Sequence, residues 1–317
     1  MIASEAPFDA PLAELRRRIE ELEGYPSGSG RERELEKLRK ELSKSTREVY
    51  GQLNRWQTTL VARHSDRPHT LDYVRHLMTD WVEMHGDRAF ADDPAVVAGL
   101  ATFGDRSVAV IGHQKGRSTK ERIRRNFGQP RPEGYRKSLR VMDMAERFKL
   151  PILTFVDTPG AYPGLGAEER GQAEAIARNL IEMARLKVPI LVTVTGEGGS
   201  GGALALGIGN RVLMLQYAIY SVISPEGCAA ILWKDQAKKK EAAEAMKISA
   251  TDLLDLGIVD EVIPEPEGGA HTGPEEACLA VGKRIEAHLA ELEKMDGTEL
   301  VADRARRFRA LGRFLED

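Results

Sequence analysis

Between residues 96 and 265, short apolar stretches alternate with segments that have the apolar spacing of helices, and this alternation strongly restricts the fold. Residues 96–103 and 108–112 are expected to form a strand pair that turns at Gly104 and Asp105. Further strands are expected at 151–156, 189–195, 211–215, 220–223 and 258–263, and helices at 135–149, 167–185, 202–208, 226–233, 237–247 and 250–256. Strands separated by helices predict a layered α/β core.

Two apolar seams precede this region. Apolar residues recur at alternating spacings of three and four in a first run at Leu12, Leu15, Ile19 and Leu22. A second run follows a Gly/Ser-rich break at 24–30, at Leu35, Leu38, Leu42, Val49, Leu53 and Trp56. This spacing is typical of a coiled coil, so a helical hairpin is expected over residues 1–60, either as a structural arm packed on the body or as an assembly device. The α/β core is expected over 61–271 and a charged helical tail over 272–317, with helices at 275–293 and 298–314.

Composition places the chain among ordinary globular proteins. Its 317 residues are 42% hydrophobic and 30% charged, with a formal net charge of −3, which is typical of a globular domain and gives no general reason to expect nucleic acid as a partner. Residues 1–15 lack the apolar region of a signal peptide, and no apolar run is long enough to span a membrane; a cytoplasmic protein is expected. Cys228 and Cys278 are the two cysteines, and without a CxxC spacing they predict free thiols rather than a zinc site or a disulfide.

A glycine-rich segment at 196–205 directly follows the expected strand at 189–195 and reads Gly-Glu-Gly-Gly-Ser-Gly-Gly-Ala-Leu-Ala. A strand, a glycine turn and a helix start would direct bare backbone N–H groups at a ligand, and such groups favour an oxyanion. Two side chains in the segment leave alternatives open. Ser200 is either a nucleophile or, more simply, a cap of the following helix, and Glu197 is either a general base or a locally paired acid.

A second glycine-rich segment, at 157–166, follows the expected strand at 151–156. It begins with Asp-Thr-Pro-Gly, which is similar to the Asp-x-x-Gly switch of a GTPase. The GxxxxGK[ST] loop that a GTPase also needs is missing from the sequence, so a nucleotide hydrolase is disfavoured. The segment is either a tight turn or a loop that lines a ligand site, and its number of glycines, with two prolines and a tyrosine, favours the second interpretation.

A basic run extends from Lys115 to Arg140, with ten lysines and arginines against two acids, Glu121 and Glu133. Such an excess indicates either a phosphate-bearing ligand or an acidic partner, or else a solvated surface. Nucleic acid is the less favoured alternative because few aromatic residues are interleaved for base stacking. The seven histidines show no HExxH or HxH spacing, so no catalytic metal is expected.

Several strings resemble the carboxyltransferase alpha subunit of bacterial and plastid acetyl-CoA carboxylase. They lie at 112–116, 124–128, 132–137, 157–164, 196–203, 221–228 and 263–266. The resemblance implies a crotonase-like fold of ββα units wound into a superhelix, with an N-terminal helical hairpin arm and a helical C-terminal tail, instead of a simple doubly wound sheet. It also implies transfer of a carboxyl group from carboxybiotin, carried on a biotin carboxyl carrier protein, to acetyl-CoA. The product would be malonyl-CoA, for fatty acid synthesis.

The resemblance further implies an α2β2 complex in which the beta subunit carries the zinc, with biotin carboxylase as another partner and no cofactor bound covalently by this chain. The amides of Gly201 and Gly202, with Ala203 as a close alternative, would stabilise the oxyanion. The same cavity would be lined by Gly160, Ala161, Tyr162, Gly164, Gly198 and Gly199. Lys115 and Arg117 are assigned to anion contact from the basic run alone. Two rivals stay open, namely an RNA-binding or assembly protein and a CoA-thioester hydratase or isomerase of the same fold, for which no acid/base pair is evident.

Overall fold

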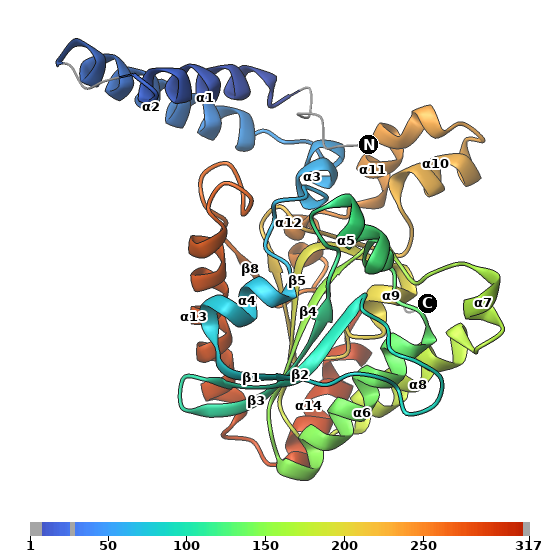
Figure 1. Cartoon of the computed structure of the whole chain (residues 1–317). Coiled ribbons are helices and arrows are strands. Elements are labelled where there is room, and N and C mark those ends of the chain that lie inside the picture. The colour runs from blue at the N-terminus through green and yellow to red at the C-terminus, as the bar shows by residue number, and fades with distance from the viewer. Residues whose placement is uncertain (1–7, 26–28, 313–317) are drawn as a thin grey trace.

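One mixed sheet organises the described part of the chain, residues 8–25 and 29–312 of this computed structural model (Figure 1). Its strands are β1 (Thr79–Glu83), β2 (Val96–Phe103), β3 (Arg106–His113), β4 (Ile152–Thr158), β5 (Ile190–Gly199), β6 (Arg211–Leu215), β7 (Ile219–Ser221) and β8 (Glu261–Ile263). Their order is β1-β2-β3-β4-β5-β6-β8, and β7 pairs with the last residues of β5. The pairs β1–β2 and β2–β3 are antiparallel, and the pairs from β3 onward are parallel.

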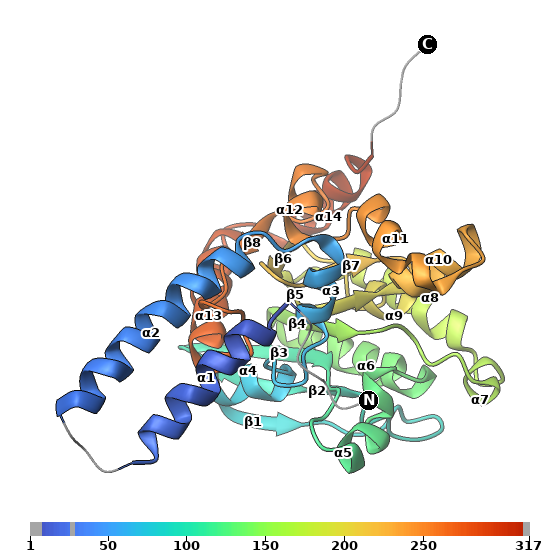
Figure 2. The ribbon, with the colours of Figure 1, turned by 90° about the horizontal axis from the view of Figure 1, so that it is seen from above.

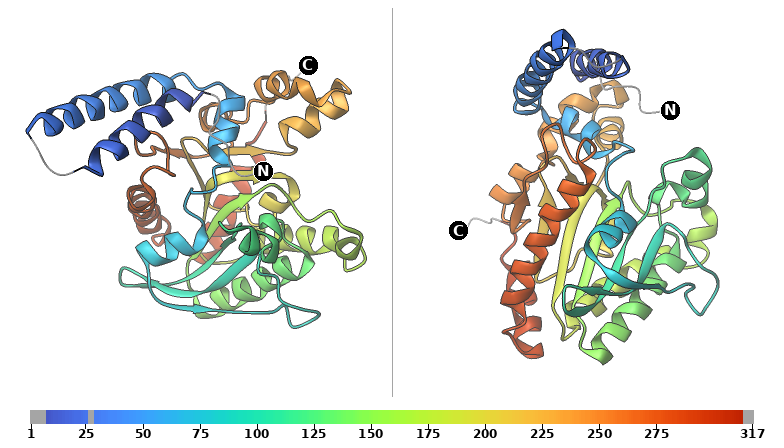
Figure 3. Two further views of the ribbon diagram at one scale, coloured as in Figure 1. Left: turned by 45° about the horizontal axis from the view of Figure 1, so that its top comes forward. Right: turned by 60° about the vertical axis from the view of Figure 1, so that its left-hand side comes forward.

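Helices connect the strands and cover both faces of the sheet. They are α5 (Thr119–Arg124), α6 (Pro132–Phe148), α7 (Leu165–Glu168), α8 (Gln172–Arg185), α9 (Ser200–Leu204), α10 (Pro225–Leu232), α11 (Lys239–Met246), α12 (Ala250–Asp255), α13 (Pro274–Leu292) and α14 (Gly297–Arg309). Helix α6 packs against β2 and β3, whereas α13 packs against β5 and β8 on the opposite side (Figure 3). Every residue of β4 and β5 is buried, as is usual for strands covered on both faces.

The sequence prediction of the strands and helices is largely confirmed. Strands β2 and β3 form the expected pair, from Val96 opposite His113 to Phe103 opposite Arg106. The helix predicted over 167–185 is divided into α7 and α8, because Gly171 has a φ of +80°, a backbone conformation that glycine adopts readily. The helix predicted from residue 202 is the short α9, and the strand predicted over 258–263 contains only the three residues of β8.

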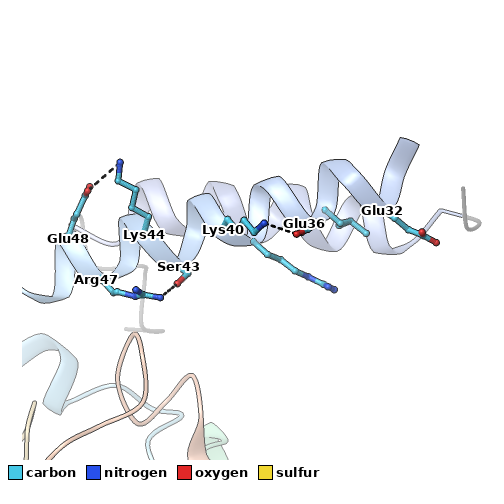
Figure 4. Close-up of a pocket in the computed structure, with 9 residues that line it drawn as sticks. Glu32, Glu36, Lys40, Ser43, Lys44, Arg47 and Glu48 are labelled. Carbon is cyan, nitrogen blue, oxygen red and sulfur yellow. Dashed lines mark hydrogen bonds and ion pairs between the residues drawn. The ribbon is translucent and has the colours of Figure 1, made fainter. Parts of the chain in front are cut away.

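The N-terminal residues form a two-helix arm that projects from the body (Figures 1 and 2). Helices α1 (Ala10–Glu23) and α2 (Ser29–Tyr50) pack through Ile19, Leu35 and Leu38. The outer face of α2 is charged (Figure 4) and carries pairs at a spacing of four residues, with the ammonium of Lys40 2.7 Å from a carboxylate oxygen of Glu36. Exposed pairs of this kind contribute little to stability because solvent screens them, so the apolar seam holds the hairpin together.

The second predicted seam is interrupted after Tyr50, which corrects the expectation that Leu53 and Trp56 continue it. A separate helix, α3 (Arg55–Ala62), begins there because Asn54 caps it: its side-chain oxygen accepts the N–H of Gln57 at 2.9 Å. An asparagine side chain in this position accepts a hydrogen bond from a helix N–H group that would otherwise have no acceptor. The predicted arm–core boundary at residue 60 falls within α3, and the break that separates the two arm helices includes residues 26–28, which lie outside the described residues.

The C-terminal helices belong to the same core as the sheet. Cys278, Ile285 and Leu289 of α13 and Leu300 of α14 are part of the main apolar cluster. Arg304 of α14 is buried and donates to the carbonyl oxygens of Leu186 and Val188. The predicted helix 298–314 ends at Arg309 as α14, and its predicted residues 313–314 lie outside the described residues. Helix α4 (Thr70–Leu77), which follows α3 in the chain, packs against α13.

Within the described ranges, every helix is too short or too polar to cross a membrane.

Candidate functional site

The glycines at 196, 198 and 199 lie in strand β5, so the prediction that they form a turn was wrong. Each is buried and close to another segment. A Cβ atom on Gly199 would lie 2.3 Å from the carbonyl oxygen of Pro159, and one on Gly198 would lie 2.8 Å from the ring of Tyr220. Glycine is needed here because neighbouring segments approach the backbone too closely for a side chain.

The turn itself occurs at Ser200, the first residue of α9. Ser200 is exposed and has a φ of +52°, a left-handed conformation that is uncommon for a residue with a side chain. The residue before α9 is Gly199, and no side chain caps the helix, which corrects the simpler interpretation of Ser200 as a helix cap. The Ser200 hydroxyl is also not hydrogen-bonded to any described residue, so the structure gives it no base that would activate it as a nucleophile.

The two glycine segments that the sequence singled out are in direct contact. A Cβ atom on Gly202 would lie 2.6 Å from the amide nitrogen of Ala161 and 2.6 Å from the carbonyl carbon of Gly160. Gly160 has a φ of +144°, and its N–H donates to the hydroxyl of Thr158 at 3.0 Å. The structure thus brings together Gly160 and Ala161 from one segment and Gly202 from the other.

Two backbone N–H groups in this contact have no acceptor among the described residues. The N–H groups of Gly201 and Gly202 donate to no residue that the structure describes, because they lie in the first turn of α9, where no preceding helical carbonyl is available. Gly201 is half-buried, whereas Gly202 and Ala203 are buried. The role of these three amides as an oxyanion site stays a prediction.

Tyr162 and Gly164 complete the segment after β4. The N–H of Tyr162 donates to the carbonyl oxygen of Pro130 at 2.9 Å, and the guanidinium of Arg131 lies 4.9 Å from the centre of its ring. A Cβ atom on Gly164 would lie 2.4 Å from the same ring. The segment is therefore folded tightly on itself, next to the loop that precedes α6.

Lys115 and Arg117 are both paired with carboxylates of this chain. The Lys115 ammonium lies 2.6 Å from Oδ1 of Asp157 and 3.9 Å from Glu197, and Arg117 lies 2.7 Å from Asp72. Much of the basic run is paired in the same way, as in Lys137 with Asp92, Arg136 with Asp87 and Arg125 with Glu121. The predicted anion contact of Lys115 and Arg117 stays untested, and each cation is already paired with a carboxylate of this chain.

Glu197 is held in a salt bridge, which supports the local-pairing alternative over a general base. One of its oxygens lies 2.7 Å from Arg63 at the end of α3, and Arg63 also lies 2.7 Å from Glu226 of α10. Arg63 and Glu226 could not be predicted from sequence, because residues that are 134 and 29 positions from Glu197 have no local pattern that marks them.

Buried titratable groups surround Asp157. Burial would raise the pKa of the Asp157 carboxyl, but the Lys115 ammonium, together with His69 and the N–H of Glu197, holds this pKa below its ordinary value. Burial lowers the pKa of His113 to about 4 and that of His69 to about 4, so both rings are neutral at pH 7. Nδ1 of His113 accepts the N–H of Asp157 at 3.3 Å.

A small polar cavity of about 190 Å³ opens beside these groups, lined by Pro159, Glu197, Lys115, His69, Arg122 and Phe127 among others. The described residues include no cluster of three or more His, Cys, Asp or Glu side chains arranged to hold a metal ion. Backbone amides in the first turn of a helix can bind and stabilise negative charge, and this is the chemistry that the contact between the two glycine segments offers.

Comparison with solved structures confirms the crotonase-like fold. The chain is similar to transcarboxylase 12S, with a TM-score of 0.58 and 20% identity over 72% of this chain and 42% of that chain. It is also similar to a chain of the Pseudomonas malonate decarboxylase hetero-tetramer in complex with coenzyme A, with a TM-score of 0.57 and 17% identity over 76% of this chain and 95% of that chain. At these identities the likeness concerns the fold alone.

Sequence comparison covers nearly the whole chain. Residues 5–312 match the family model described as "Acetyl co-enzyme A carboxylase carboxyltransferase-like". The chain is 59% identical to the acetyl-coenzyme A carboxylase carboxyl transferase subunit alpha of Syntrophotalea carbinolica over 96% of each chain. It is 56% identical to that of Geobacter metallireducens over 98% of each chain. The chain therefore belongs to the acetyl-CoA carboxylase carboxyltransferase family that its sequence motifs resemble.

Proposed function

We propose that this chain, as the alpha subunit of a multi-subunit enzyme, transfers a carboxyl group from carboxybiotin to acetyl-CoA and so forms malonyl-CoA for fatty acid synthesis. Its family membership and its relatives, which are named as alpha subunits of this carboxyl transferase, support the proposal. The proposed partners are a beta subunit in an α2β2 complex, a biotin carboxyl carrier protein and biotin carboxylase. Zinc is assigned to the beta subunit, and the enzyme would work in the cytoplasm.

The observation that carries the mechanism is the contact between the two glycine segments. Carboxybiotin supplies the carboxyl group, and the biotin that remains bears negative charge on its ureido oxygen until it takes up the proton that leaves the methyl group of acetyl-CoA. The N–H groups of Gly201 and Gly202, with that of Ala203 as the alternative, would donate hydrogen bonds to this oxygen. Each such donor contributes roughly 3 kcal/mol to catalysis in other oxyanion sites. The absence of a side chain at Gly202, where a Cβ atom would strike Gly160 and Ala161, is consistent with a site built from backbone.

Substitution of Gly202 tests this mechanism. The Gly202→Ala variant places a Cβ atom 2.6 Å from the backbone of Gly160 and Ala161, so the two segments must move apart. We expect carboxyl transfer from malonyl-CoA to free biotin, assayed with the beta subunit, to fall by roughly 100- to 1,000-fold. Circular dichroism and co-purification with the beta subunit would show that the variant still folds and assembles.

The matched control is Gly30→Ala, since a Cβ atom at Gly30 would meet no atom within 4 Å. This variant should keep the wild-type rate. A Gly202→Ala enzyme with the wild-type rate would contradict the assignment of the oxyanion site.

A further inference from the structure

The carboxylate of Asp157 links the two glycine segments. Asp157 lies in β4, two residues before Pro159, and its side chain is buried, with 3% of the residue exposed. Its Oδ1 atom accepts the backbone N–H of Glu197 in β5 at 2.9 Å and lies 2.6 Å from the ammonium of Lys115. One oxygen therefore joins the segment that contains Gly160 to the segment that contains Gly202, and one cation neutralises it.

The backbone of β5 is shaped around this carboxylate. A Cβ atom on Gly196 would lie 2.4 Å from Oδ1 of Asp157, so the carboxylate occupies the space that a side chain would need. Arg63 holds the side chain of Glu197 in a salt bridge. Glu197 is thus fixed through its N–H by Asp157 and through its carboxylate by Arg63, immediately before Gly198 and Gly199.

We propose that Asp157 and Lys115 are positioning residues for carboxyl transfer, which hold the two glycine segments at the separation that the amide donors require. The inference rests on the function proposed above. The contact leaves little freedom, because Gly199 and Gly202 lie against Pro159 and Ala161 without room for a Cβ atom. An oxyanion donor works at about 2.7–3.1 Å from the developing charge. A misplacement of about 1 Å can lower a rate by about 100-fold.

Two variants separate the charge of the Asp157–Lys115 pair from the hydrogen bond that Asp157 makes to Glu197. Lys115→Met leaves the Asp157 carboxylate buried beside Glu197 without its cation, and a buried charge that loses its partner is strongly unfavourable. Asp157→Asn keeps an oxygen that can accept the N–H of Glu197. The double variant Lys115→Met/Asp157→Asn therefore retains the link between the segments while it removes both charges.

The test measures kcat and KM for malonyl-CoA in carboxyl transfer to free biotin, with each variant assembled with the beta subunit. We expect Lys115→Met to lower kcat by roughly 10- to 100-fold with KM within about twofold of wild type, since only geometry is changed. We expect the double variant to recover kcat to within about threefold of wild type, because its acceptor oxygen is retained. The control is Lys238→Met, which removes a lysine from an exposed pair with Glu241 (3.0 Å) and should leave both constants unchanged.

Three results would overturn the inference. The first is an unchanged kcat in Lys115→Met. The second is a raised KM with unchanged kcat in that variant, which would indicate that Lys115 contacts the substrate. The third is a double variant that stays as slow as Lys115→Met. If Lys115→Met does not fold, the double variant alone decides: recovery to near the wild-type kcat supports the inference and a large loss overturns it. Failure of the wild-type complex to transfer a carboxyl group would instead contradict the proposed function.

Discussion

At the scale of single residues, glycine in this site marks close approach between segments. The segment 196–202 has the composition of a flexible linker, yet Gly196, Gly199 and Gly202 each face an atom of another segment at a distance that excludes a Cβ atom. The left-handed turn is made by Ser200. The glycines therefore allow the ends of β4 and β5 to pack backbone against backbone.

Gly196→Ala is the sharpest single-residue test of this packing outside the proposed oxyanion site. Its Cβ atom would lie 2.4 Å from Oδ1 of Asp157, so the carboxylate must move away from the N–H of Glu197. We expect the free energy of unfolding, measured by urea denaturation, to fall by about 1–3 kcal/mol, as for other substitutions that overfill a core. Gly30→Ala serves again as the control. Equal stability of the two variants would argue that the Asp157 carboxylate does not pack closely against the backbone of Gly196.

At the scale of elements, short helices position the site. Helix α9 has five residues, and its first turn carries the candidate amides. Helix α3 has eight residues and ends next to Arg63, which holds both Glu197 and Glu226. A helix of this length is not stable by itself, so its capping and its packing against the core determine where Arg63 lies.

Asn54 is the residue on which α3 most directly depends. Its side chain accepts the N–H of Gln57, and the side chain of Gln57 accepts the N–H of Asn54 in return. We expect Asn54→Ala to lower the free energy of unfolding by about 1 kcal/mol. Asn54→Asp keeps an oxygen acceptor at the positive end of the helix and should preserve stability. Equal losses in the two variants would show that the cap contributes little.

At the scale of the whole molecule, burial of neutral histidines links stability to pH. Burial lowers the pKa of His69 and of His113 to about 4 and that of His271 to about 3. Their ordinary value is about 6.5. Below that pH the unfolded chain binds protons that the folded chain does not, so the folded state loses stability as the pH falls from 6.5 toward 4.

Urea denaturation between pH 6.5 and 4.5 would measure this effect. Each such histidine contributes at most about 1.4 kcal/mol per pH unit to the decline. His271→Gln should therefore make the decline shallower than in the wild-type protein. A decline of the same steepness in His271→Gln would contradict the assignment of a neutral, buried ring.

Much of the fold could be predicted from sequence, because apolar periodicity reports directly on strands such as β2 and on helices such as α6. Motifs also located both glycine segments and, through the resemblance, the family. The sequence could not distinguish a glycine needed for a turn from one needed for close approach, since both depend on contacts with distant residues. Arg63, Glu226 and Arg304 were missed for the same reason: their partners lie far along the chain, and no local spacing marks an ion pair or an anchor of that kind.

In the proposed function, this chain provides half of a carboxyltransferase site and the beta subunit provides the other half. The most direct measurement is malonyl-CoA-dependent carboxylation of free biotin by the purified chain, by the beta subunit, and by the two mixed. We expect transfer by the mixture, little or none by either chain alone, and loss of transfer when the mixture contains Gly202→Ala. Absence of transfer in a mixture that assembles, or full transfer with Gly202→Ala, would contradict this expectation.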